Sequence, residues 1–186
     1  MVSALILMLV SITISRIKAE AAEDYDKPGF EYLLKGQIDE AIEECKRTLA
    51  INPNNFAAHN NLGTAYFRKG MYDEAIRECK EAIKINKPNY AEPYHTLGLI
   101  YSAKGLYDDA LREQKRAVKI NPNYAEAYGS IGVIYLKKGR YDEAVLKFRK
   151  ALELNGCEFV LFGHSPKPST FKKMEVCGKS VGLLLG

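Results

Sequence analysis

Few residues in this chain have the type and spacing that catalysis or metal binding requires. The three histidines, His59, His95 and His164, have no partner at the spacing of a metal site or a catalytic triad. The stretch Gly178-Lys179-Ser180 is similar to the end of a phosphate-binding loop, but that loop needs a glycine where Lys173 stands, and no strand is predicted before it. We therefore expect no enzyme activity, no metal site and no cofactor in this chain.

The composition is that of a soluble globular protein. Of the 186 residues, 47% are hydrophobic and 27% are charged, which excludes collagen, a polytopic membrane protein and a wholly disordered chain. The net charge of +4 is too small to indicate a nucleic-acid partner. None of the four cysteines belongs to a CxxC pair, which argues against both a disulfide scaffold and a zinc knuckle.

One pattern recurs along the chain after 34 or 35 residues. The recurring positions are Gly29, Gly63, Gly98 and Gly132; Tyr32, Tyr66, Tyr101 and Tyr135; Gly36, Gly70, Gly105 and Gly139; and Ala41, Ala75, Ala110 and Ala144. A fixed period of this length indicates stacked copies of one helical or stranded unit. Because all 12 tyrosines fall on repeat-equivalent positions, we expect them to pack between helices rather than to stack on a ligand.

Each repeat is expected to hold two antiparallel helices. In the second repeat Leu62, Gly63 and Tyr66 share one face of a first helix, and Gly70 ends it. Small side chains at Gly63 and Ala75 would let the two helices approach closely.

Two cysteines occupy equivalent places on the second helices of adjacent repeats. Stacked repeats would hold Cys45 and Cys79 further apart than the ~7 Å that a disulfide tolerates between Cα atoms. We expect both to be free and buried.

This pattern resembles the tetratricopeptide repeat family, in which a large residue, Leu-Gly, Tyr, Ala, an aromatic residue and Pro recur every 34 residues. The matching residues are Tyr94, Leu97-Gly98, Tyr101, Ala110, Ala117 and Pro122, followed by Tyr128, Ile131-Gly132, Tyr135, Ala144, Phe148 and Ala151. The resemblance implies an all-α, right-handed superhelical solenoid of helix-turn-helix repeats over residues 22–155. Its repeats would span about 22–55, 56–90, 91–124 and 125–155. The chain departs from the pattern at Pro28, at His59 and at Gln114.

The resemblance also implies a function. In this family the first helix of each repeat lines a concave surface that holds a peptide or a partner helix. The residues that would line this groove are Asn60, Thr64, Phe67, His95, Leu99, Ser102, Gly129, Val133 and Leu136. Because they are largely neutral and apolar, we expect a hydrophobic or helical segment of a protein partner as the ligand. The alternative, that Leu99 and Val133 contact neighbouring helices instead, stays open because periodicity cannot place a residue at the edge of a face.

The first 21 residues are expected to act as a signal peptide or a membrane anchor. Residues 2–14 are almost wholly apolar, and Ala19-Glu20-Ala21 has the form of a cleavage site. Arg16 and Lys18 follow the apolar run, which would favour an uncleaved anchor attached through residues 1–15, and an ordinary buried helix is a third reading. These features favour export to the periplasm or the extracellular space, or anchoring, over a cytoplasmic location.

The repeat pattern ends abruptly at Asn155, and an irregular tail of residues 156–186 follows. This tail could fold over the last helix, another chain could cover that helix, or the gene could have shifted its reading frame. The first functional hypothesis is a non-enzymatic scaffold that binds a peptide or helix in its groove. The alternative is a truncated or frame-shifted accessory fragment of a larger repeat-containing protein or enzyme.

Overall fold

The computed structural model describes residues 29–85, 90–156, 160–161, 174–176 and 179–181. The expected signal peptide or anchor at residues 1–21 lies outside these residues, as do His164 and Gly178 of the phosphate-loop-like stretch. In the part of the chain that is described, no helix is both long and apolar enough to cross a membrane.

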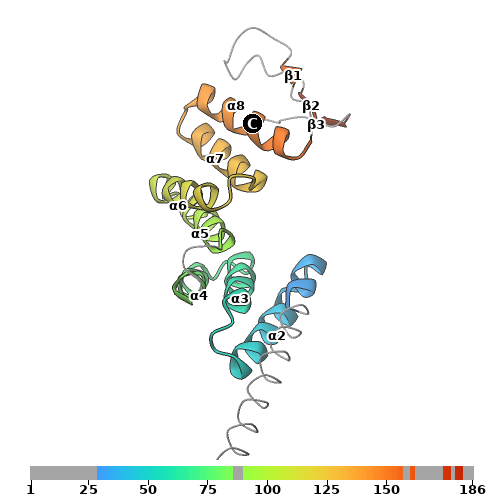
Figure 1. Ribbon diagram of the computed structural model, residues 1–186, viewed down its shortest axis with the longest axis vertical. Coiled ribbons are helices and arrows are strands. Elements are labelled where there is room, and N and C mark those ends of the chain that lie inside the picture. The colour runs from blue at the N-terminus through green and yellow to red at the C-terminus, as the bar shows by residue number, and fades with distance from the viewer. Residues whose placement is uncertain (1–28, 86–89, 157–159, 162–173, 177–178, 182–186) are drawn as a thin grey trace, which may run out of the picture. The chain divides into compact units, whose positions relative to one another are not determined.

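The described chain is built from helices in repeated pairs (Figure 1). Residues 29–35 are helical, and the labelled helices are α2 (Ile38–Ile51), α3 (Phe56–Arg68), α4 (Tyr72–Ile85), α5 (Glu92–Ala103), α6 (Tyr107–Ile120), α7 (Ala125–Lys137) and α8 (Tyr141–Leu154). The predicted all-α repeat fold is confirmed, since each repeat contributes a first helix, a tight turn and a second helix.

The turn inside each hairpin has the same geometry in all four repeats. Gly70 has φ 80° and Gly139 has φ 71°, a left-handed conformation that disfavours other residues. The residue after each glycine then donates its N–H to a tyrosine carbonyl one turn back, at 2.8–2.9 Å. These tyrosines are Tyr32, Tyr66, Tyr101 and Tyr135. The sequence positions these turns through the recurring glycine, and acidic residues then open the second helix at its positive end.

The second recurring glycine marks where the two helices of a hairpin cross. A Cβ atom on Gly63 would lie 2.8 Å from Cys79 Sγ and 3.2 Å from the Ala75 carbonyl oxygen. A Cβ atom on Gly132 would lie 2.7 Å from the ring of Phe148. Gly29 meets Cys45 and Gly98 meets Gln114 in the same way. The four glycines therefore occupy equivalent close crossings, as predicted.

The chain divides into two compact bodies, of which the first ends at Thr96 and the second begins at Leu97. In the first body α2 packs on α3 and α3 on α4, around a core that includes Leu33, Ile42 and Leu62. Cys45 and Cys79 are buried free thiols in this body, as expected.

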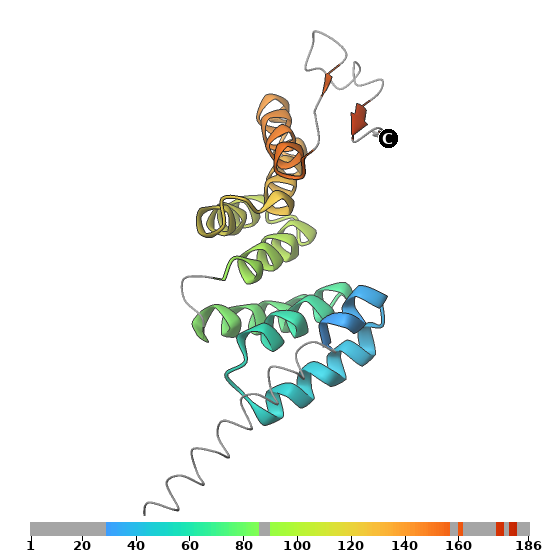
Figure 2. The same cartoon turned by 45° about the vertical axis from the view of Figure 1, so that its right-hand side comes forward.

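In the second body α6 packs on α7 and α7 on α8, around Leu111, Ile131 and Ile134. The hairpin of α7 and α8 is seen in orange in Figure 1 and again in Figure 2.

The tail was expected to be irregular, but part of it forms a small β-sheet. It carries three short antiparallel strands in the order β1 (Val160–Leu161), β2 (Met174–Val176) and β3 (Lys179–Val181). Met174 pairs with Val181, and Val160 pairs with Glu175. Strands this short have no periodicity that a sequence pattern could reveal.

Candidate functional site

In the first body, Asn60 of α3 is engaged in internal contacts. It is only 7% exposed, and its Oδ1 accepts a hydrogen bond from Thr96 Oγ1 at 3.5 Å. Its backbone carbonyl accepts a second hydrogen bond, from Thr64 Oγ1 at 3.0 Å. Asn60 and Thr64 were both predicted to line a groove. Asn60 contacts Thr96 of the next repeat, whereas the Thr64 hydroxyl bonds within its own helix.

Two other predicted groove residues of this body are partly buried. The ring of Phe67 lies 6.1 Å from that of Tyr72, centroid to centroid, so part of its surface is used in the turn of its own hairpin. His95 of α5 is half-buried.

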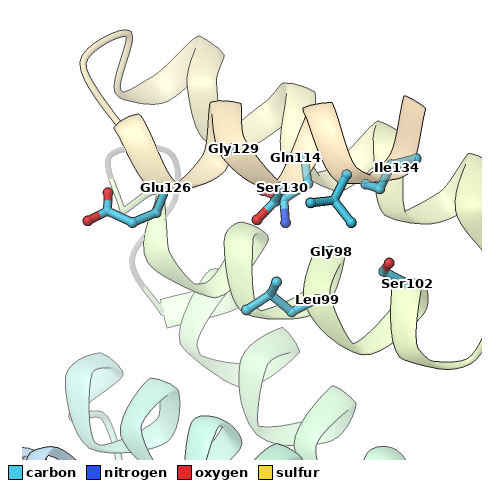
Figure 3. A pocket seen from close by; sticks show the side chains of 9 residues that line it. Gly98, Leu99, Ser102, Gln114, Glu126, Gly129, Ser130 and Ile134 are labelled. Atoms are coloured by element: carbon cyan, nitrogen blue, oxygen red, sulfur yellow. The ribbon is translucent and has the colours of Figure 1, made fainter. Parts of the chain in front are cut away.

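The second body contains a pocket of about 280 Å³ between α5 and α7 (Figure 3). Its lining residues are Gly98, Leu99, Ser102, Gln114, Glu126, Gly129, Ser130, Val133 and Ile134. Four predicted groove residues are brought together here: Leu99 and Ser102 from α5, and Gly129 and Val133 from α7. Figure 3 shows Leu99 extending from α5 into the space below Ser130 and Gln114.

The fifth groove residue predicted for this body, Leu136, lies elsewhere. It packs against the core formed by Leu111, Ile131 and Ile134 and does not line the pocket. Val133, by contrast, is 45% exposed and faces the pocket, although the sequence left open whether it would contact only neighbouring helices.

Several lining residues were missed by sequence reasoning. Glu126 and Ser130 lie on the same face of α7 as Val133, seven and three residues before it, so helical spacing could have identified them. Gln114 comes from α6 and is fully buried. No local pattern in the sequence indicates that a residue of α6 reaches the pocket.

The pocket is nearly neutral. Among the described residues that line it, Glu126 is the one that carries a charge, and it lies in the first turn of α7. No side-chain hydrogen bond or ion pair joins Glu126 to another residue in the ranges that the structure describes. In Figure 3 its side chain extends away from the helix at one end of the pocket.

The size of the pocket and the groups around it limit what it can hold. Among the residues that the structure describes, no group of three His, Cys, Asp or Glu side chains could hold a metal ion. A volume of about 280 Å³ falls just below the ~300 Å³ at which pockets for small organic ligands begin. It is large enough for one bulky side chain of a partner.

Comparison with protein families gives three matches that together cover this architecture. A tetratricopeptide repeat description matches residues 54–123, a TPR repeat description matches 29–70, and a further tetratricopeptide repeat description matches 95–156. The chain belongs to the tetratricopeptide repeat family. No curated protein gives a significant match to the sequence.

Solved structures of other tetratricopeptide repeat arrays resemble it. A crystal structure of MamA is 33% identical and has a TM-score of 0.62, over 77% of this chain and 84% of that one. A second MamA structure is 35% identical with a TM-score of 0.61, over 75% of this chain and 77% of the other. PilF of Pseudomonas aeruginosa is 22% identical, covers 75% of this chain and 63% of its own, and has a TM-score of 0.68, which shows a shared fold.

Proposed function

We propose that this tetratricopeptide repeat protein is a non-enzymatic interaction module that binds a peptide or helical segment of a protein partner. Tetratricopeptide repeat proteins generally bind protein partners, and this chain shares their repeats over residues 29–156. The observation that carries the proposal is the pocket between α5 and α7, where the predicted groove residues Leu99, Ser102 and Val133 meet. Binding there would bury exposed apolar surface of Val133 together with an apolar side chain of the partner.

A pair of matched variants tests this proposal. Val133→Glu places a charge in the pocket, whereas Leu146→Glu places the same charge on α8 at a residue that is 59% exposed and outside the pocket. Both wild-type residues are exposed aliphatic side chains of the second body, so both variants should fold. Full-length chains would be used for affinity capture, and the bound proteins quantified by mass spectrometry.

We expect Val133→Glu to lose a partner that Leu146→Glu and wild type both retain. Leu99→Ala should weaken capture of the same partner, because it removes apolar contact surface. If all four chains recovered the same proteins in equal amounts, the pocket would have no part in binding.

We also propose that the protein acts outside the cytoplasm or at a membrane surface. The support is the sequence of residues 1–21, with its apolar run and its cleavage-site pattern. Protease digestion of intact cells, with a tag at the C-terminus, tests this location. A tag that remains protected until the cells are lysed, together with an uncut N-terminus, would overturn export.

A further inference from the structure

Gly129 lies in the interior of α7 with no structural reason to be glycine. A Cβ atom added there would meet no heavy atom within 4 Å. Its backbone is not among those with positive φ, which the described glycines show only at hairpin turns and after α8. Glycine in the middle of a helix is less stable than alanine, so this position carries a stability cost that packing does not explain.

Gly132, on the same helix, does have a packing reason to be glycine. Gly132 faces Phe148 of α8, and a Cβ atom there would lie 2.7 Å from the ring. A Cβ atom at Gly132 would thus meet the packed helix and one at Gly129 would not, so only Gly132 is required by the helix crossing. In the two preceding repeats the position of Gly129 is held by Asn60 and His95.

Gly129 lines the pocket between α5 and α7, which suggests a role in binding rather than in helix packing. Because it borders the pocket and its missing side chain would extend into open space, any larger residue would take up pocket volume. The absence of a side chain thus keeps room between Leu99 and Val133 for a bulky group of a ligand.

Glu126 supplies the charge at one end of this space. It lies one helical turn before Gly129 on the same face of α7 and is exposed. Leu99 and Val133 are apolar, and the remaining polar lining groups are uncharged. A ligand that matches this arrangement presents a bulky apolar side chain to the space beside Gly129 and a cation to Glu126.

Resting on the proposed function, we infer that the pocket selects a partner segment in which a bulky apolar side chain lies beside a lysine or arginine. Gly129 determines the size of the accepted side chain, and Glu126 determines its charge. An acidic or wholly polar segment would not be accepted.

The probes are short fluorescein-labelled peptides on a Gly-Ser background. They carry a central Phe or Leu with Lys, Gln or Glu beside it, and one control has Ser at the centre and Lys beside it. Binding to the full-length protein is measured by fluorescence polarisation at low and high salt. Wild type is compared with Gly129→Ala, Gly129→Leu and Glu126→Gln, and the melting temperature of each variant is recorded.

We expect the Phe–Lys or Leu–Lys peptide to bind most tightly. Gly129→Leu should weaken it about tenfold or more by filling the pocket, with no fall in melting temperature. Gly129→Ala should raise the melting temperature and still weaken binding, which a merely structural role of Gly129 would not produce. Glu126→Gln should weaken the Lys peptide by about two- to fivefold and leave the Gln peptide unchanged, and high salt should abolish this difference.

Other results would overturn the inference in distinguishable ways. Equal binding of the Lys, Gln and Glu peptides would remove Glu126 from recognition, while loss of partner capture in Val133→Glu would leave the proposed function intact. Tighter binding of a peptide with this chain's own residues 179–186 than of any panel peptide would assign the pocket to the tail. A dimer in sedimentation that Gly129→Leu dissociates would assign it to a second copy.

Discussion

His59 of α3 and Glu78 of α4 form a hydrogen bond across their hairpin, with 2.7 Å between His59 Nδ1 and Glu78 Oε2. The other ring nitrogen of His59, Nε2, lies 3.1 Å from the backbone carbonyl oxygen of Pro53. A neutral imidazole has one N–H, so both acceptors are satisfied only when His59 is protonated. The hydrogen bond to Glu78 is the main cause that raises the pKa of His59 above its ordinary value of 6.5, against the opposing effect of burial.

In the last repeat a different contact joins the two helices at the equivalent positions. At the equivalent positions it has Tyr128 and Lys147, and the Lys147 Nζ lies 5.8 Å from the centroid of the tyrosine ring. This is a cation–π contact in place of a charged hydrogen bond. This position therefore holds a histidine in the second repeat and a tyrosine in the last.

The first prediction concerns the pH dependence of stability. Because the pKa of His59 is raised on folding, its contribution is fully present below the unfolded value near 6.5 and is lost as pH rises through the folded value. The melting temperature of wild type should therefore fall as pH rises above neutrality. Glu78→Gln should reduce this dependence and cost about 1–3 kcal/mol at mildly acidic pH, where His59 is protonated and the carboxylate is ionised, because it replaces a charged hydrogen bond.

The matched control for this prediction is the double variant His59→Tyr with Glu78→Lys, which reproduces the pair found in the last repeat. It should fold and should lose the pH-dependent component above neutrality. A wild-type slope that persists in this double variant would show that another group is responsible.

The second prediction compares two glycines of α7. Gly132→Ala should destabilise the fold by about 1–3 kcal/mol, because its Cβ would lie 2.7 Å from the ring of Phe148. Gly129→Ala should stabilise it by about 0.5–1 kcal/mol, because alanine is the better helix former and nothing opposes its Cβ. Urea unfolding followed by circular dichroism measures both. Changes of the same sign would contradict the distinction between a packed Gly132 and an unpacked Gly129.

The third prediction concerns thiol reactivity. Cys45 and Cys79 are buried free thiols, and burial raises the pKa of Cys79 further above its ordinary value, so its thiolate is scarce at neutral pH. Alkylation by iodoacetamide, followed residue by residue with peptide mass spectrometry, should be slow at both positions in the native protein. It should become rapid in denaturant. Rapid native alkylation of Cys79 would mean that the α3–α4 hairpin opens readily.

The fourth prediction concerns an ion pair that occurs at equivalent positions in two places along the chain. Lys69 Nζ lies 2.6 Å from Asp39 Oδ1, and Lys138 Nζ lies 2.5 Å from Asp108 Oδ1. The hydrogen bond from Lys138 lowers the pKa of Asp108, so any stabilisation is present above the unfolded value near 3.8 and is lost as pH falls through the folded value.

Lys138→Gln should shift the pKa of Asp108 back upward in an NMR titration. The melting temperature should change little, because the Asp108 side chain is 87% exposed and water screens the pair. The ion pair of Asp39 with Lys69 lies in the other body and serves as an internal control, because Lys138→Gln should leave the NMR titration of Asp39 unchanged. A large loss of thermal stability in Lys138→Gln would show that the pair is structurally more important than its exposure suggests.

The repeated hairpin could be predicted from the amino-acid sequence alone. The recurring glycine at the Gly63 position marks where two helices touch, and the one at the Gly70 position marks where the backbone turns. Both requirements are local, so the repeat period alone locates them. The same logic identified Cys45 and Cys79 as buried thiols, because equivalent positions in a repeat pack equivalently.

Which of the predicted groove residues reach the pocket follows from packing across the fold. Spacing placed Asn60, Val133 and Leu136 on the same kind of helix face, yet Asn60 bonds to Thr96, Leu136 packs on the core and Val133 lines the pocket. What separates them is the neighbour that each side chain meets across the fold. Residues from another helix set that neighbour, and no period within one helix encodes them. Gly129 is the same case, because its missing side chain acquires a role only where α5 and α7 leave a space beside it.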